Sequence, residues 1–400
     1  MSFPIQPVPS MFRRFFPICL TLTCLAMTAA TVSPNAAAET LSAYVGTYTD
    51  GVSKGIHHFT LDTETGSLSE PRLVAEMKNP SFLAIHPTGQ FLYAVGETAD
   101  QRDGDKDSGS IHAFAIDEAT GDLTALNEVV SGGGAPCHIN VDAAGNFALV
   151  ANYSGGNASV FRIDSDGKLG ERTALVQHRG ASINPRRQKE PHAHSINLDP
   201  ANRFALVADL GIDKVMVYRF DAAAGTLEER GSADLTPGSG PRHLCFHPNG
   251  KFVFVINELK LTISSFQYDA NSGTLDPVQT VSTLPESVED FSGMSTAEVV
   301  VHPSGRFLYG SNRGHDSITV CAVDDSTGKL SVQQNLQLDG KTPRNIVIDP
   351  SGKFLLVEHQ KSNSIVVYKI DAESGKLTKT EHQATVGSPV CIRFMVRQAF

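Results

Sequence analysis

The segment Asp62-Thr-Glu-Thr-Gly-Ser-Leu68 decides the fold, because its pattern, an Asp followed after a few residues by Gly-x-Leu, returns along the whole chain. Asp and Gly supply the backbone conformations of a tight hairpin turn, and the Leu begins the next strand. The chain is therefore built from seven repeats. Their Asp and Leu residues pair as Asp62 with Leu68, Asp117 with Leu123, Asp164 with Leu169, Asp221 with Leu227, Asp269 with Leu275, Asp324 with Leu330 and Asp371 with Leu377.

A second pattern precedes the first in most repeats: a turn such as His247-Pro-Asn-Gly250, then an aromatic residue that opens an apolar run. The period of about 50 residues matches one four-stranded propeller blade. The runs are short and rich in β-branched or aromatic residues, and no long helical periodicity occurs. We therefore expect an all-β chain that forms a seven-bladed β-propeller. The aromatic residues are Phe91, Phe147, Phe204, Phe252, Phe307 and Phe354.

The two ends of the repeat array complement each other. The array begins in the middle of a repeat at Ala43-Tyr-Val45, and it finishes with Ser388-Pro-Val-Cys-Ile-Arg393, which resembles the opening strand of a repeat. We expect the N- and C-terminal strands to share one blade and so close the ring. An open β-solenoid or a pair of sandwiches fits less well, because the repeat is too long for one coil of a β-helix.

The N-terminal residues are typical of an export signal. Arg13 and Arg14 precede an apolar run that extends to about Ala30, and Ala36-Ala-Ala38 follows before Glu39. A charged segment, a short apolar segment and an A-x-A site describe a secretory signal peptide. We expect residues 1–38 to be removed, leaving residues 39–400 as a periplasmic or secreted propeller. A retained membrane anchor is disfavoured, because the apolar run is short and soon interrupted.

Charge and cysteine content exclude several partners. A net charge of −10 gives no general attraction to nucleic acid or anionic lipid. No C-x-x-C pair occurs, so a structural zinc site is not expected. The segment Asp103-Gly-Asp-Lys-Asp107 lacks the later bidentate Glu of a calcium-binding EF-hand loop, and we interpret it as a solvated insertion. Buried free thiols are expected at the four cysteines beyond the signal: Cys137, Cys245, Cys321 and Cys391.

Aligning the repeats predicts which residues gather at the central channel, since equivalent positions lie at equal depth around the axis. The start of each inner strand and the end of the following strand should meet at one mouth of the channel. The inner-strand positions are Ser81, Cys137, His194, Arg242, Ala297, Arg344 and Val390. The strand-end positions are Tyr48, Glu97, Tyr153, Leu210, Glu258, Arg313 and Gln360. The residues just before them are Thr47, Gly96, Asn152, Asp209, Asn257, Asn312 and His359.

Polar and charged residues are concentrated in these sets. Arginine binds carboxylate or phosphate bidentately, so several arginines at one mouth of a net acidic protein indicate a small anionic or oxygen-rich ligand. Polar side chains that are merely solvated remain the alternative. We assign substrate contacts to Arg344, His243, Asn152, Asn257, Asn312 and His359.

Several motifs resemble a known family. Gly240-Pro-Arg-His243, Asn257-Glu-Leu259 and Ser311-Asn-Arg-Gly314 are similar to motifs of the seven-bladed propeller lactonases, which include bacterial 6-phosphogluconolactonase and, as a relative, the fungal carboxy-muconate lactonising enzyme. The resemblance runs from about Leu41 to the C-terminus. It implies a site without metal or organic cofactor, formed by His194, Arg242, Glu258 and Arg313. Since two extra residues precede His194, His192 is the alternative histidine.

This resemblance implies hydrolysis of a sugar lactone. We expect His194 or Glu258 to activate water, and Arg242 and Arg313 to hold the oxyanion or an anionic substrate group. His194 is the favoured base, because Glu258 among arginines should be ionised and orienting. Export favours an unphosphorylated aldonolactone, because phosphorylated sugars belong to the cytoplasm. The alternatives are a muconate-type cycloisomerase and a propeller used as a non-catalytic binding platform. No Gly-x-Ser-x-Gly motif supports a serine esterase.

Overall fold

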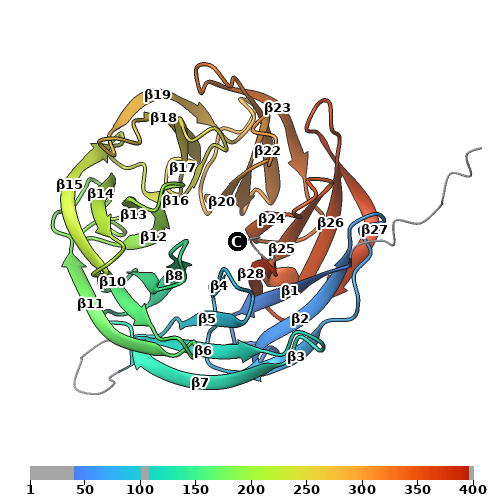
Figure 1. The fold of residues 1–400 in the computed structure, drawn as a ribbon. Helices are drawn as coiled ribbons and strands as arrows, with labels where there is room; N and C mark the ends of the chain where they lie inside the picture. Colours follow the sequence, from blue (N-terminus) through green and yellow to red (C-terminus); the bar gives the residue numbers. More distant parts are fainter. Residues whose placement is uncertain (1–39, 101–107, 396–400) are drawn as a thin grey trace, which may run out of the picture. The chain divides into compact units, whose positions relative to one another are not determined.

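Seven antiparallel sheets of four strands each are arranged in a ring around a central axis in the computed structural model, which describes residues 40–100 and 108–395 (Figure 1). The predicted seven-bladed β-propeller is confirmed. Its helical content within the described ranges is one 3-10 turn, η1 (Gln360–Ser362), and none of these residues forms a helix that could cross a membrane. The expected signal peptide and the segment from Asp103 to Asp107 lie outside the described residues.

Each blade runs outward from the channel in strand order. The innermost strands are β28 (Pro389–Phe394), β4 (Leu83–Ile85), β8 (Pro136–Val141), β12 (Ala193–Leu198), β16 (Pro241–Phe246), β20 (Ser295–Val301) and β24 (Pro343–Ile348). The second strands are β1 (Thr40–Thr47), β5 (Phe91–Gly96), β9 (Phe147–Asn152), β13 (Phe204–Asp209), β17 (Phe252–Asn257), β21 (Phe307–Arg313) and β25 (Phe354–His359). The third strands are β2 (Gly55–Asp62), β6 (Ser110–Ile116), β10 (Asn157–Ile163), β14 (Lys214–Asp221), β18 (Thr262–Tyr268), β22 (Ser317–Val323) and β26 (Ser364–Ile370). The outermost strands are β3 (Arg72–Glu76), β7 (Leu123–Val130), β11 (Leu169–Gln177), β15 (Thr226–Asp234), β19 (Leu275–Ser282), β23 (Leu330–Gln337) and β27 (Leu377–Thr385).

The ring closes as the two ends of the array predict. Strand β28 pairs antiparallel with β1, with Tyr44 opposite Arg393 and Gly46 opposite Cys391. The first blade therefore contains the C-terminal strand as its innermost member and β1 to β3 outside it. Closure leaves the innermost position of that blade filled, as in the other six.

The two repeated patterns meet at the blade interfaces. The Gly of each turn has a positive φ, for example +79° at Gly273, and in six blades it packs on the aromatic residue of the adjacent blade. A Cβ at Gly273 would lie 2.7 Å from the Phe204 ring, so a larger residue could not enter without displacing that ring. The six contacts are Gly66 on Phe354, Gly167 on Phe91, Gly225 on Phe147, Gly273 on Phe204, Gly328 on Phe252 and Gly375 on Phe307.

Most of the inner strands carry a β-bulge near their starts. Pro241 pairs with Asn257 and His243 pairs with Ile256, which leaves Arg242 without a partner. The same irregularity leaves a residue unpaired in four other blades, at Cys137, His194, Arg344 and Val390. A bulge re-aims a side chain, and here it turns both Arg242 and the following His243 toward the channel.

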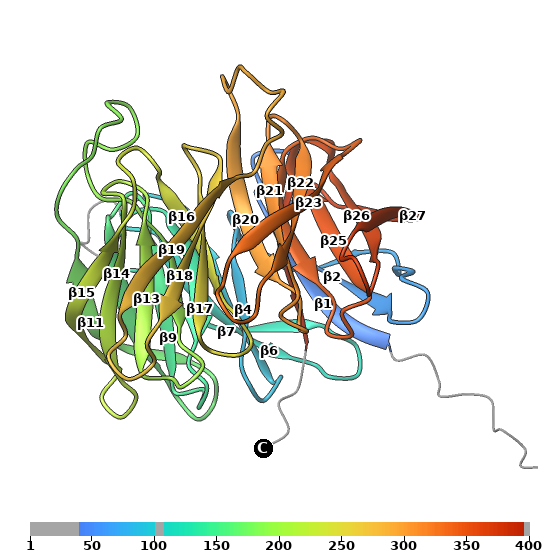
Figure 2. The ribbon, with the colours of Figure 1, turned by 90° about the horizontal axis from the view of Figure 1, so that it is seen from above.

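Two long loops rise from the same side of the propeller, residues 178–192 between β11 and β12 and residues 283–294 between β19 and β20 (Figure 2). Each leads directly into an inner strand, so this side is the one at which the inner strands begin. The four cysteines within the described residues are free, as expected. Cys137, Cys321 and Cys391 are buried, whereas Cys245 is partly exposed.

Candidate active site

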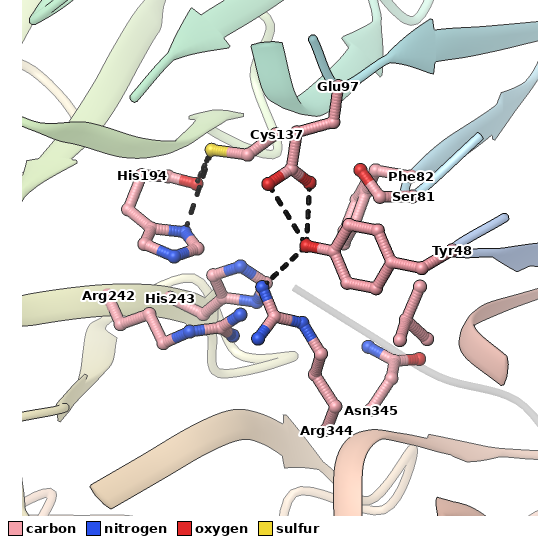
Figure 3. A pocket seen from close by; sticks show the side chains of 11 residues that line it. Tyr48, Ser81, Phe82, Glu97, Cys137, His194, Arg242, His243, Arg344 and Asn345 are labelled. Atoms are coloured by element: carbon pink, nitrogen blue, oxygen red, sulfur yellow. Dashed lines mark hydrogen bonds between the residues drawn. The ribbon is translucent and has the colours of Figure 1, made fainter. Parts of the chain in front are cut away.

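A polar pocket lies at the channel mouth where the inner strands begin (Figure 3). Its empty space is about 250 Å³, including the part open to solvent. Six of the seven inner-strand positions predicted from the repeat alignment line it, so the register was read correctly. The lining residues are Tyr48, Ser81, Phe82, Glu97, Cys137, His194, Arg242, His243, Arg344, Asn345 and Val390.

Glu258 is held by three arginines beside this pocket. Its Oε2 lies 2.9 Å from Arg313 and 3.2 Å from Nε of Arg242, and its Oε1 lies 2.8 Å from Arg187. Burial alone would raise the pKa of the Glu258 carboxyl, but the charges of Arg313, Arg242 and Arg187 outweigh burial and lower this pKa to about 2. Glu258 is therefore ionised at neutral pH, as expected, and fixes the directions of the guanidinium groups.

Arg242 and Arg313 are also anchored to the backbone of β20. Arg242 donates to the carbonyl of Ala297 at 2.7 Å, and Arg313 donates to the carbonyl of Thr296 at 2.7 Å. Burial and the neighbouring Arg242 lower the pKa of Arg313 to about 10, which still leaves the guanidinium charged at neutral pH. Of these two, Arg242 lines the pocket and Arg313 lies behind it, bound to Glu258.

A second polar cluster forms the opposite wall of the pocket. Tyr48 donates its hydroxyl proton to Glu97 at 2.8 Å, and Arg344 donates to the same hydroxyl at 2.8 Å (Figure 3). The Arg344 guanidinium also lies over the Tyr48 ring, 5.1 Å from its centroid. Arg344 is therefore held at the pocket from a different blade than Arg242, and the two cations approach the cavity from separate sides.

His194 lines the pocket, whereas His192, the alternative, stacks on Tyr153 outside it with ring centroids 4.4 Å apart. Burial and the charge of Arg242 hold the pKa of His194 well below its usual value, so its imidazole is neutral. Its Nδ1 lies 3.7 Å from the Cys137 thiol. A neutral imidazole in the pocket has a lone pair that can accept a proton.

Four residues expected to contact substrate do not line the pocket: Asn152, Asn257, Asn312 and His359. The amides of the three asparagines are used inside their own blades; Asn312, for example, donates to the hydroxyls of Ser317 and Thr319. The physical reason is strand alternation, because neighbours such as Asn312 and Arg313 point to opposite faces. The prediction that these four residues contact the substrate is therefore wrong for this pocket, since none of them lines it.

Sequence reasoning missed Arg187, which reaches Glu258 from the loop of residues 178–192. That loop is an insertion relative to the repeat, so the alignment could not place it. It is anchored by the buried Gln188, whose amide donates to the carbonyl of Leu210 and to Asp213 at 2.8 Å. Tyr48 and Glu97 are strand-end positions of the repeat alignment, which predicts them at the channel mouth, but the sequence does not indicate a substrate contact for either. Both line the pocket.

The closed propeller and its arginine-lined pocket with a neutral imidazole define an enzyme of the lactonase class, a carboxylic ester hydrolase that acts on lactones. The chain belongs to the family described as lactonase, 7-bladed beta-propeller, whose family model matches residues 42–394.

Named relatives agree with this membership. A 6-phosphogluconolactonase of Bacillus subtilis is 38% identical over 301 residues, which cover 75% of this chain and 83% of the relative. The structure of a putative 6-phosphogluconolactonase from Bacteroides fragilis superposes with a TM-score of 0.82 at 34% identity, covering 90% of this chain and 99% of the other. A periplasmic gluconolactonase of Pseudomonas aeruginosa superposes with a TM-score of 0.83 at 31% identity, covering 90% and 100%.

Proposed function

We propose that this chain is an exported enzyme that hydrolyses a sugar lactone, with an unphosphorylated aldonolactone as substrate. The observation that carries the proposal is the pair Arg242 and Arg344, which approach one small pocket from different blades beside two neutral imidazoles, those of His194 and His243. Guanidinium groups stabilise negative charge that develops on a carbonyl oxygen, and a neutral imidazole accepts the proton of an attacking water. The similarity to the periplasmic gluconolactonase supports both the substrate class and the location.

The residues take the following roles in this proposal. Arg242 binds the lactone carbonyl oxygen, Arg344 binds the opposite side of the substrate, and Glu258 with Arg313 keeps Arg242 in place. The sequence assigned the proton-accepting role to His194, and its position in the pocket is consistent with contact to substrate. Asn152, Asn257, Asn312 and His359 lie outside the pocket lining, and their side chains bond to neighbours in their own blades.

The substrate test uses the purified protein with glucono-δ-lactone, its 6-phosphate and a carboxy-muconate, following acid release and ultraviolet absorbance. We expect hydrolysis of gluconolactone at a kcat/KM at least ten times that of the 6-phosphate. Preference for the 6-phosphate would contradict the proposed substrate, and turnover of the muconate alone would favour the cycloisomerase alternative. Arg242→Ala should lower lactone kcat/KM by about 100-fold, the size expected for loss of one oxyanion donor.

Export is tested separately. If residues 1–38 act as a cleavable signal, protein recovered from the periplasmic or culture fraction of a bacterial host begins at Glu39 when its N-terminus is sequenced. Full-length protein found only in the cytoplasmic fraction would contradict export and would remove the argument against a phosphorylated substrate.

A further inference from the structure

A buried carboxyl–imidazole pair lies at the base of the pocket. Nδ1 of His243 on β16 is 2.8 Å from Oε1 of Glu298 on β20, so the pair joins two adjacent blades. His243 is 4% exposed and Glu298 is 6% exposed. The other carboxyl oxygen of Glu298 accepts a hydrogen bond from the side-chain amide of Asn345 on β24. Glu298 is therefore fixed from two sides, and it fixes one nitrogen of His243.

The second nitrogen of His243 is unpartnered, and the residue lies at the pocket. His243 is one of the pocket-lining residues, while Glu298, which binds Nδ1, is not. The other ring nitrogen, Nε2, is a buried atom without a hydrogen-bond partner among the described residues. Figure 3 shows the His243 ring between the side chains of His194 and Arg344. Its centroid lies 5.2 Å from that of His194 in an edge-to-face contact.

His243 is better equipped than His194 to accept a proton. A histidine that accepts a proton becomes an imidazolium, and a carboxylate bound to its other nitrogen stabilises that cation and fixes the tautomer. Glu298 supplies such a group to His243. The corresponding contact of His194 is the Cys137 thiol at 3.7 Å, which carries no compensating charge.

The charged groups around His243 keep it neutral before reaction. Burial and the charges of Arg242, Arg393, Arg344 and Arg313 hold its pKa well below the usual value. The imidazoles of His138 and His194 face it from β8 and β12. Burial raises the pKa of Glu298, although Arg242 and Arg393 oppose this shift. A neutral His243 with a free Nε2 can accept a proton throughout the neutral range.

We propose that His243, oriented by Glu298, is the general base of the lactone hydrolysis; this rests on the function proposed above. Water attacks the lactone carbonyl carbon, its proton moves to Nε2 of His243, and the carbonyl π electrons pass to the oxygen held by Arg242. When the intermediate collapses, the ring C–O bond breaks and the leaving ring oxygen takes the proton back from Nε2. The product is the open hydroxy acid. His243 is thus a catalytic residue, and Glu298 is a positioning residue.

The kinetic test measures kcat of gluconolactone hydrolysis from pH 3 to 7.5 for the parent and three variants, because the acid limb of a base with a lowered pKa lies well below neutral pH. His243→Gln should lower kcat by 10²- to 10⁴-fold, the usual contribution of a general base, and should remove the acid limb of the profile. Glu298→Gln should lower kcat and move the acid limb to lower pH by about one unit or more, because the carboxylate that favours imidazolium is gone.

His138→Gln is the matched control. His138 is equally buried, and its ring lies 5.4 Å from that of His243, so its loss perturbs the same packing. We expect this variant to keep the parent acid limb. A His243→Gln variant with more than a tenth of the parent kcat, or a Glu298→Gln variant with an unmoved acid limb, would overturn the assignment to His243.

A second measurement does not depend on the substrate. Nitrogen NMR of the folded parent should show His243 protonated on Nδ1 with a lone pair on Nε2, and Glu298→Gln should shift the Nδ1 resonance. If the parent hydrolyses no lactone but shows this tautomer, the proposed function is wrong, whereas the assignment of His243 as a proton acceptor oriented by Glu298 stands. If the lone pair is found on Nδ1, the proposed base is wrong whatever the substrate.

Discussion

At the scale of single residues, the candidate site depends on one carboxylate shared by three cations. Replacing Glu258 by Gln removes the charge that Arg313, Arg242 and Arg187 surround. Breaking a buried ion pair from one side leaves uncompensated charge, and we expect a loss of about 3 kcal/mol in the free energy of unfolding at pH 7. Denaturant titration of parent and variant measures it.

The pH dependence of that loss has a definite sign. The pKa of Glu258 is lowered to about 2 in the folded protein, so the stability it adds is fully present above its unfolded pKa of about 4.3. It disappears as pH falls toward 2, where the parent and the Gln variant should converge. Arg187→Ala is the control, because Arg187 is 41% exposed and solvent screens its pair, so about 1 kcal/mol or less is expected. A gap that stays constant from pH 7 to 3 would contradict this account.

Single residues also mark how far sequence reasoning reached into the site. The repeat register correctly predicted that His194, Arg242 and Arg344 lie at one depth. This works because equivalent positions of the blades lie at the same height along the propeller axis. It failed for Asn257 and Asn312, since it treated neighbours on one strand as sharing a face. It could not reveal that Glu298 meets His243, because that contact depends on a bulge in each inner strand that moves the pairing by one residue.

At the scale of elements, the turn glycines connect adjacent blades. Gly273→Ala combines two costs: an unfavourable positive φ of about 1 kcal/mol and overpacking of the added methyl against Phe204 of about 1–3 kcal/mol. Gly250→Ala is a matched control, because Gly250 has φ +70° and nothing within 4 Å of its would-be Cβ. Urea unfolding should therefore show a loss of about 1 kcal/mol for Gly250→Ala and two- to fourfold more for Gly273→Ala. Equal losses would mean that the Gly–Phe contact does not restrict size.

The same elements explain why the fold was predictable and the loop was not. The turn Gly and the strand Phe recur because each blade must pack on the next. The same residue types are therefore needed at equivalent positions of the repeats. The loop of residues 178–192 is free of that requirement. Its buried anchor is Gln188, whose side-chain amide donates to the carbonyl of Leu210 and to Asp213. Arg187 reaches Glu258 from this loop, and its position could not be predicted by aligning the repeats because the loop has no equivalent in the alignment.

At the scale of the whole molecule, the pocket exists only if the ring is closed. Strand β28 contributes Val390 to the pocket wall and buries Cys391 and Ile392. It is the last strand of the described chain in sequence and the innermost strand of the first blade. A chain ending at Ser388 would lose this strand and leave the edge of β1 unpaired. Burial of each large apolar side chain contributes about 1.5–3 kcal/mol, so together with the lost ladder hydrogen bonds the deletion removes about 5 kcal/mol or more, comparable to the whole stability of many domains.

We expect the chain ending at Ser388 to be aggregation-prone and without lactonase activity, and a synthetic peptide of residues 387–395 added in trans to restore part of both solubility and activity by pairing with β1. A chain ending at Met395 is the control and should behave as the parent, because it keeps all of β28. Gel filtration and lactone turnover measure the outcome. A soluble, active chain ending at Ser388 would contradict the dependence of the pocket on closure, because Arg344 and Tyr48 would then hold their positions on either side of an open seam.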